Sequence, residues 1–115
     1  MDFYENYKKR REELKEKSIN ISLEEGKKCW EKHHSKRKAD YNECSKNSVF
    51  LYHVFSDGKR RLNAKKRENK QKCEELANPA QLKICKLKVY EDLCKDLESL
   101  NRKLDREYLS YKASL

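Results

Sequence analysis

The chain has 115 residues, of which 43% are charged and 36% hydrophobic, and its formal net charge is +9. A chain of this length is expected to form one domain, and so few apolar residues build only a small core. Two glycines and one proline argue against a β-sandwich and against a glycine-rich nucleotide site. They favour long helices that are stabilised by cross-links or by a partner.

The first part of the sequence predicts two helices. Residues 1–18 can form a short amphipathic helix, and residues 18–21 look like a break. Ser22 and Glu25 fit a capping box, in which each side chain satisfies a free backbone N–H group at the start of a helix. Apolar and small residues then recur at steps of three or four, which predicts a helix over about 23–56.

The second part of the sequence predicts two more helices and a chain reversal. Gly58 suits the left-handed C-cap that would end the preceding helix, so the chain is expected to turn back there. A thin apolar stripe predicts a third helix over about 59–77. Asn78 and Pro79 then provide an N-cap and a first-turn proline for a fourth helix.

The last helix has the clearest apolar pattern of the chain, and we predict that it binds a partner. Residues 95–115 are expected to extend beyond the hairpin with an uncovered apolar stripe. Exposed stripes of this length mark interfaces, so a partner is expected to cover this one. The alternative is that residues 1–18 fold back and cover it. The predicted partner-binding residues are Leu93, Leu97, Leu100, Leu104, Tyr108, Tyr111 and Leu115.

Five cysteines are the most informative feature: Cys29, Cys44, Cys73, Cys85 and Cys94. Pairs with zinc-finger spacing are absent, and Cys29 with His33 and His34 lacks a second ligand cluster, so no metal site is expected. If the chain folds back at Gly58, Cys44 lies opposite Cys73 or Cys85, and Cys29 opposite a cysteine further along. Two such bridges leave one cysteine free. Free buried cysteines in a cytosolic bundle are the alternative.

A basic run covers residues 59–72, with eight Lys or Arg against one Glu. Such a run can attract nucleic acid, anionic lipid or an acidic protein face, or it can be a solvated helix surface. The apolar run between residues 49 and 55 is too short to cross a bilayer, so no membrane span is expected. The candidate basic patch comprises Lys59, Arg60, Arg61, Lys65, Lys66, Arg67, Lys70 and Lys72.

Two segments resemble a known family. Cys29-Trp30 followed by Arg37, Tyr41 and Cys44 is similar to the first arm of the coiled-coil-helix–coiled-coil-helix family, the twin C-x9-C proteins of the mitochondrial intermembrane space. The segment from Cys85, CKLKVYEDLCKDLESLNRKLDREYLSYK, is similar to the family's second arm and tail, and members of the cytochrome oxidase subunit VIb type show comparable arms. The intervals of 28 and 11 residues from Cys44 through Cys85 also resemble those of a complex I accessory-type subunit. The resemblance implies a helical hairpin with two cysteines on each arm, and oxidation in that compartment.

We therefore expect an all-α fold: a disulfide-stapled helical hairpin with an extended C-terminal helix. The expected parts are an N-terminal arm (1–21), the cysteine-containing hairpin (22–94) and the docking helix (95–115). The expected function is that of a non-catalytic accessory subunit or assembly factor of a respiratory complex, with other protein subunits as partners and no cofactor. Two alternatives remain: a basic nucleic-acid-binding protein in the cytoplasm, and a secreted or periplasmic disulfide-stapled binder. No nucleophile–base set or paired-acid site stands out, so an enzyme is not expected.

Overall fold

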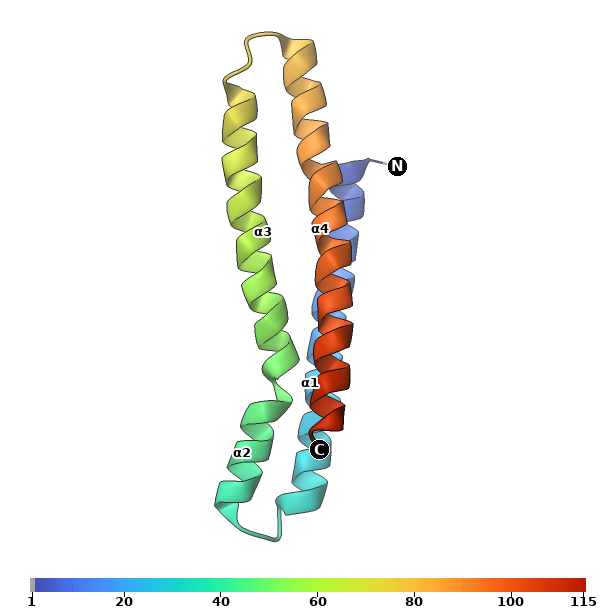
Figure 1. The fold of residues 1–115 in the computed structure, drawn as a ribbon, viewed down its shortest axis with the longest axis vertical. Helices are drawn as coiled ribbons and strands as arrows, with labels where there is room; N and C mark the ends of the chain where they lie inside the picture. The colour runs from blue at the N-terminus through green and yellow to red at the C-terminus, as the bar shows by residue number, and fades with distance from the viewer. Residues whose placement is uncertain (1) are drawn as a thin grey trace.

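The computed structural model describes residues 2–115, which are helical apart from short connections. The helices are, in chain order, α1 (Phe3–His33), α2 (Lys38–Ser48), α3 (Phe50–Glu74) and α4 (Pro79–Ala113). Since Val49 alone separates α2 from α3, these two helices form one bent arm. The chain thus makes three arms, each antiparallel to the one before it, with α1 and α4 running in the same direction (Figure 1). The bundle is elongated, measuring 66 × 23 × 19 Å. The all-α prediction is confirmed, and two disulfides link the helices.

The first reversal of the chain lies at residues 34–37, inside the segment predicted to be one helix over 23–56. That prediction is wrong because residues 33–37, His-His-Ser-Lys-Arg, offer no aliphatic side chain that could be buried by continuing the helix. The backbone N–H of Lys36 donates to the carbonyl of His33 at 2.9 Å and closes the turn. Together with the break at Val49, the reversal divides the predicted helix into the end of α1, the whole of α2 and the first residues of α3.

The second reversal of the chain lies at residues 75–78, and α4 begins directly after it, where the sequence predicts the start of a helix. The side-chain oxygen of Asn78 accepts hydrogen bonds from the backbone N–H groups of Ala80 and Gln81 at 2.9 and 3.3 Å. Pro79 occupies the first helical position, where its missing N–H costs nothing. Asn78 and Pro79 are therefore confirmed as the start signal.

The break predicted at residues 18–21 does not occur, because α1 runs through it. Ser18 and Ser22 are buried within α1, and the Ser18 hydroxyl donates to the carbonyl of Lys15 at 2.8 Å, which keeps it hydrogen-bonded inside the helix. Ser22 and Glu25 are consequently interior residues of α1 and not a capping box. The boundaries expected at 21/22 and 94/95 both lie inside continuous helices.

Gly58 lies inside α3, so the chain reversal expected there is wrong. A Cβ at this position would lie 2.6 Å from Cδ1 of Leu100, which is far below van der Waals contact. The absence of a side chain therefore lets α3 approach α4 closely. Gly58 serves helix packing and not helix termination.

The core lies along the middle of the bundle, where α4 packs against both α1 and α3. The leucine stripe of α4 faces inwards, and Leu97 is only 1% exposed. Tyr7 and Leu14 of α1 and Leu51 and Phe55 of α3 belong to the same buried cluster. Among residues 2–115, no helix is both long and apolar enough to cross a membrane.

The two glycines provide a matched pair of substitutions. Gly58→Ala gains about 1 kcal/mol of helix propensity but forces the new methyl group against Leu100, which costs about 1–3 kcal/mol. Gly26→Ala gains the same propensity, and its Cβ would meet Ser48 Oγ at an ordinary 3.6 Å. In urea unfolding of the oxidised protein, Gly26→Ala should be the more stable variant by at least about 1 kcal/mol. Equal stabilisation by both substitutions would contradict the close approach of α3 and α4.

Candidate functional site

The three arms differ in reach, and this difference creates a two-helix tip at each end of the bundle (Figure 1). The N-terminal end of α1 lies beside the middle of α4, where the rings of Tyr4 and Tyr90 are 5.0 Å apart. Residues 66–88, which we call the upper tip, therefore comprise α3 and α4, with α1 beside only their lower end. At this end the third helical position of the bundle is not filled by the described residues.

The lower tip, residues 26–47, comprises the end of α1 and nearly all of α2, including Cys44. The C-terminal end of α4 reaches only the edge of this tip. The Tyr108 hydroxyl donates to Glu25 at 3.0 Å, and the rings of Tyr111 and Phe50 are 4.7 Å apart. Beyond these contacts α1 packs on α2 alone.

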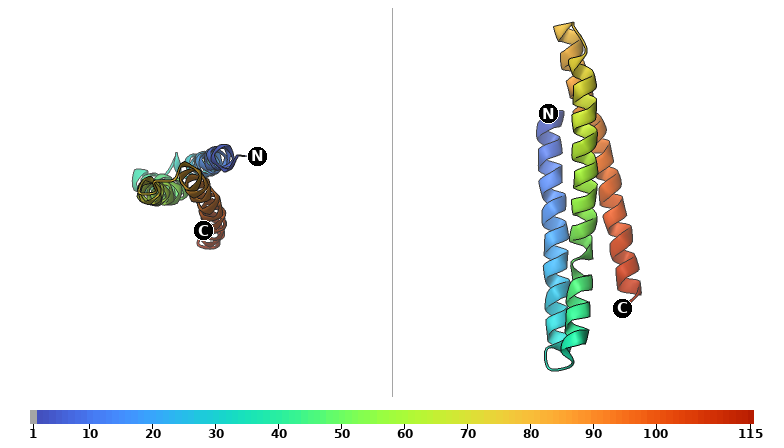
Figure 2. Two further views of the ribbon diagram at one scale, coloured as in Figure 1. Left: turned by 90° about the horizontal axis from the view of Figure 1, so that it is seen from above. Right: turned by 90° about the vertical axis from the view of Figure 1, so that its left-hand side faces the viewer.

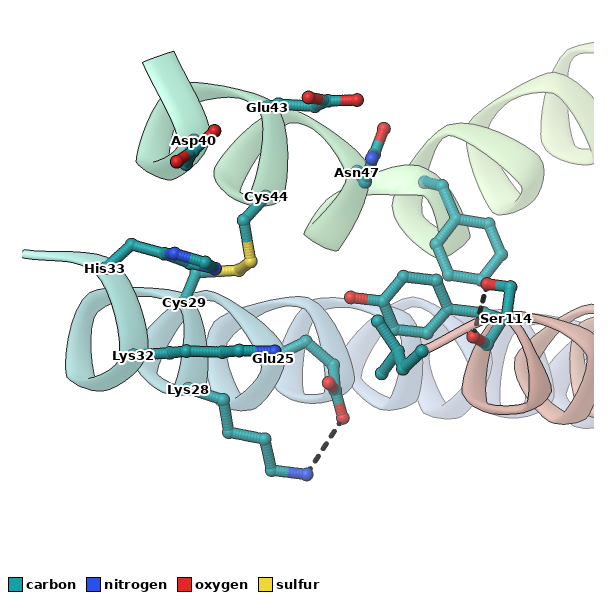
Figure 3. Close-up of a pocket in the computed structure, with 13 residues that line it drawn as sticks. Glu25, Lys28, Cys29, Lys32, His33, Asp40, Glu43, Cys44, Asn47 and Ser114 are labelled. Carbon is teal, nitrogen blue, oxygen red and sulfur yellow. Dashed lines mark hydrogen bonds and ion pairs between the residues drawn. A yellow bond between two sulfur atoms is a disulfide. The ribbon is translucent and has the colours of Figure 1, made fainter. Parts of the chain in front are cut away.

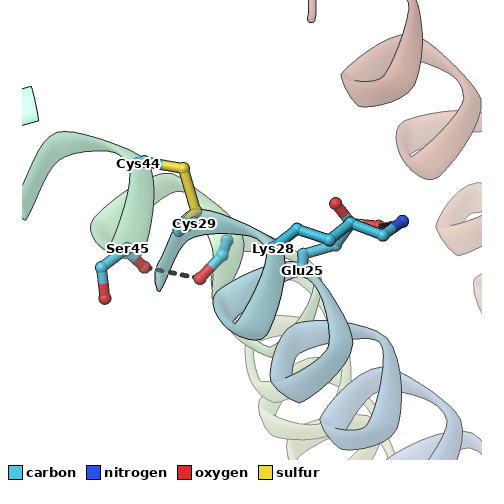
Figure 4. Close-up of a disulfide and its surroundings, with 6 residues drawn as sticks. Glu25, Lys28, Cys29, Cys44 and Ser45 are labelled. Atoms are coloured by element: carbon cyan, nitrogen blue, oxygen red, sulfur yellow. Dashed lines mark hydrogen bonds and ion pairs between the residues drawn. A yellow bond between two sulfur atoms is a disulfide. The ribbon is translucent and has the colours of Figure 1, made fainter. Parts of the chain in front are cut away.

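Each tip contains one disulfide. Cys29 pairs with Cys44 in the lower tip, and Cys73 pairs with Cys85 in the upper tip, each with 5.7 Å between the Cα atoms. Figure 4 shows the first bridge crossing from α1 to α2. The expected pairing about Gly58 is wrong, because the chain reverses between Cys29 and Cys44 and again between Cys73 and Cys85. Each bridge thus closes a neighbouring pair of helices.

Cys94 carries the free thiol and lies in the three-helix part of the bundle. It is buried, and its sulfur lies 3.9 Å from Nδ2 of Asn6 and 3.7 Å from the carbonyl of Phe3. Burial raises the pKa of this thiol, and Glu98 adds to the effect while Arg10 opposes it. Cys94 is therefore a packing residue and a poor nucleophile.

A groove of about 640 Å³ runs along the lower tip, beside the Cys29–Cys44 bridge and the end of α4 (Figure 3). Its charges are mixed. Glu25, only 3% exposed, accepts from Tyr108 and from Lys28 at 3.1 Å. The hydrogen bond to Glu25 raises the pKa of the Lys28 amine. Because the buried carboxylate is already paired, it links α1 to α4 and is not free to act on a substrate.

The segment with Cys29, His33 and His34 does not form a set of metal ligands. Cys29 is committed to a disulfide and cannot be a thiolate ligand beside His33 and His34. Within residues 2–115, no group of three or more potential ligands is arranged for a metal ion.

An exposed aromatic cluster covers the outer side of the lower tip. Trp30 is 55% exposed, stacks on His34 at 5.0 Å and meets Tyr41 edge-on at 5.7 Å. Trp30 belongs to the apolar positions that predict the helix over 23–56, so the spacing predicts a buried side chain, and this prediction is wrong. Cys29 and Trp30 are adjacent, and adjacent residues of a helix point about 100° apart, so both cannot lie at the centre of one buried stripe. Cys29 is the one that faces inwards. Exposed tryptophan held by aromatic neighbours is typical of a binding surface.

The predicted docking stripe of α4 is largely covered by the chain itself. Its four leucines from Leu93 to Leu104 are buried, Tyr108 and Tyr111 are half-buried, and Leu115 is exposed. The expectation of an uncovered stripe is therefore wrong. The alternative in which residues 1–18 fold back is the one observed, since Tyr7 and Leu14 of α1 pack in the same cluster.

The predicted basic patch does not form one continuous face. Three of its members pair with acids: Arg60 with Asp57, Lys65 with Asp96, and Lys72 with Glu68. Lys66 and Lys70 instead line a groove of the upper tip.

Comparisons with known proteins give no relative: no family description, no curated protein and no solved structure matches this chain.

The thiol arrangement predicts a simple chemical result. Under non-reducing conditions, peptide mapping should join Cys29 to Cys44 and Cys73 to Cys85, and the intact mass should rise by about 4 Da on reduction.

In the folded oxidised protein at pH 8, alkylation of Cys94 should be slow, because burial and its raised pKa both suppress the thiolate. Addition of denaturant should make it fast. Rapid alkylation without denaturant would contradict the burial of Cys94.

Proposed function

We propose that the protein is a non-catalytic docking protein of an oxidising compartment. Two observations support the proposal. Two of its three helix pairs are closed by disulfides, which persist where thiols are not kept reduced. Its largest exposed aromatic side chain, Trp30, lies one residue from a bridged cysteine, so its backbone is fixed before binding.

The observation that carries the docking role is the cluster of Trp30, His34 and Tyr41. An aromatic anchor contributes most to an interface when little conformational entropy is lost on binding. Here the ring contacts and the neighbouring bridge restrict Trp30 in the free protein. The cluster is therefore suited to occupy an apolar pocket on another protein.

For the compartment and the partner, we propose the mitochondrial intermembrane space and a respiratory complex, with this protein as an accessory subunit or assembly factor. The resemblance of residues 29–44 and 85–112 to the twin-cysteine family supports this choice. The bridges, however, join different helix pairs, whereas that family's plan has both across one hairpin.

A pair of exposed substitutions tests the docking role. Trp30→Ala should remove the anchor and shift the protein from a high-mass assembly to the free form on native gels of cell extracts. Leu109→Ala, on a residue of α4 that is more exposed than Trp30 (67% against 55%), should leave the assembly unchanged. Circular dichroism should show that both variants keep the fold, because neither side chain is buried.

Two outcomes would contradict the proposal. In one, Trp30→Ala migrates with the assembly in the same proportion as Leu109→Ala does. In the other, rapid acid quenching and thiol trapping show all five cysteines reduced in cells. Fractionation of mitochondria separately tests the compartment, since recovery outside the intermembrane space would exclude the proposed location while leaving the docking role intact.

A further inference from the structure

The upper tip has a groove of about 690 Å³ between α3 and α4. It continues along the line of α1, whose first residues, Asp2 and Tyr4, close its lower end. In the middle of the bundle, α1 occupies the equivalent position against α3 and α4 (Figure 2). The groove is thus the place where a third helix would lie if the three-helix packing continued upwards.

Aliphatic side chains form one part of the groove lining. Pro79, Leu82 and Leu87 recur along one face of α4, and Tyr90 follows at the junction with α1. Leu87 is 41% exposed. A third helix packed at this level would cover it. These positions are spaced i, i+3, i+8 and i+11, which keeps them on one face of the helix, as in a stripe that receives another helix.

Lysines form the other part of the lining. Lys66 and Lys70 project from α3, and Lys83 and Lys86 from α4. Lys86 pairs with Glu74 at 3.0 Å, but among residues 2–115 no acid pairs with the other three. The N-terminal end of α1 adds partial positive charge, although Asp2 offsets part of it by capping Tyr4.

The charges of these lysines repel one another. Partial burial lowers the pKa of Lys66, and the neighbouring cations Lys70, Arg11 and Arg67 lower it further. A carboxylate placed in the groove would relieve this repulsion, because opposite charges favour the protonated amine. The groove is therefore complementary to a ligand that is both apolar and anionic.

We propose that the upper tip binds an acidic amphipathic helix of a partner protein, which completes the three-helix bundle there. Leucines of the partner would cover Leu82 and Leu87, and its glutamates or aspartates would face Lys66, Lys70 and Lys83. The part of α4 beyond the start of α1, from residue 79 to 88, is about 15 Å long, so it accommodates about three helical turns. This surface is at the opposite end from Trp30, and the inference does not depend on the docking role of Trp30.

The aromatic rings favour a helix over single-stranded nucleic acid. Nucleic-acid grooves of this kind use free aromatic faces on which bases stack. Here the ammonium of Lys70 lies 4.9 Å from the ring centroid of Tyr90, and Lys8 lies 4.9 Å from that of Tyr4. The two rings also meet edge-on, so the stacking faces are largely occupied. Tyr90 is buried, Tyr4 keeps 39% of its surface exposed, and the aliphatic side chain of Leu87 keeps 41%.

Fluorescence anisotropy with the oxidised full chain tests the inference. The probe is a labelled peptide of about 14 residues, designed to place leucines on one helical face with glutamates on both sides of it. Lys66→Gln with Lys70→Gln should weaken binding at least about tenfold at 150 mM salt. Leu87→Ser should also weaken it, because an apolar contact is lost.

The matched control removes the same charge from elsewhere. Lys46→Gln with Lys103→Gln alters two exposed lysines outside the groove and should change affinity less than about threefold. Equal losses in the two double variants would show attraction by net charge alone and overturn the inference. So would absence of peptide binding, or tighter binding of an oligothymidylate that competes with the peptide. Circular dichroism melts confirm that each variant is folded.

Discussion

Two antiparallel helices can bury only one narrow stripe from each partner, and this chain has few apolar residues for such a stripe. In the middle of the bundle the problem is met by a third helix, so that Leu93, Leu97 and Leu104 are almost completely buried. Neither tip has that third helix. The disulfides lie in the tips, each closing a ring of about 12–15 residues, for which chain-entropy arguments give about 3 kcal/mol. Covalent cross-links therefore stabilise the parts of the bundle where packing is weakest.

This division of roles has a consequence for function. A tip that is held together by a disulfide does not have to bury all of its apolar side chains in order to stay folded. Some of these side chains can therefore remain exposed. Trp30 at the lower tip and Leu87 at the upper tip are both exposed in this way, beside bridges that hold their helices in register. The tips are consequently preorganised surfaces, and preorganisation reduces the entropy lost on binding.

Local signals predicted part of this fold correctly. Asn78 and Pro79 act through bonds and ring geometry within their own turn, so the start of α4 could be read from the sequence. The leucine spacing of α4 likewise predicted a buried or docking face, although not which segment covers it. The stop signal at Gly58 is misleading because a glycine is needed there for the close approach of Leu100, which is 42 positions away in the chain. The pairing of the cysteines depends on the turn at 34–37, which carries no glycine or proline signal.

The central claim is that each disulfide stabilises its own two-helix tip and that packing stabilises the middle. Hydrogen exchange measured by mass spectrometry on the Cys29→Ser, Cys44→Ser double variant tests it most directly. Amides of residues 27–47 should exchange much faster than in the oxidised parent, while those of residues 93–104 keep their protection. The matching variant of the second disulfide should expose the upper tip instead. Uniform loss of protection along the chain, or unchanged protection in the lower tip, would contradict the account.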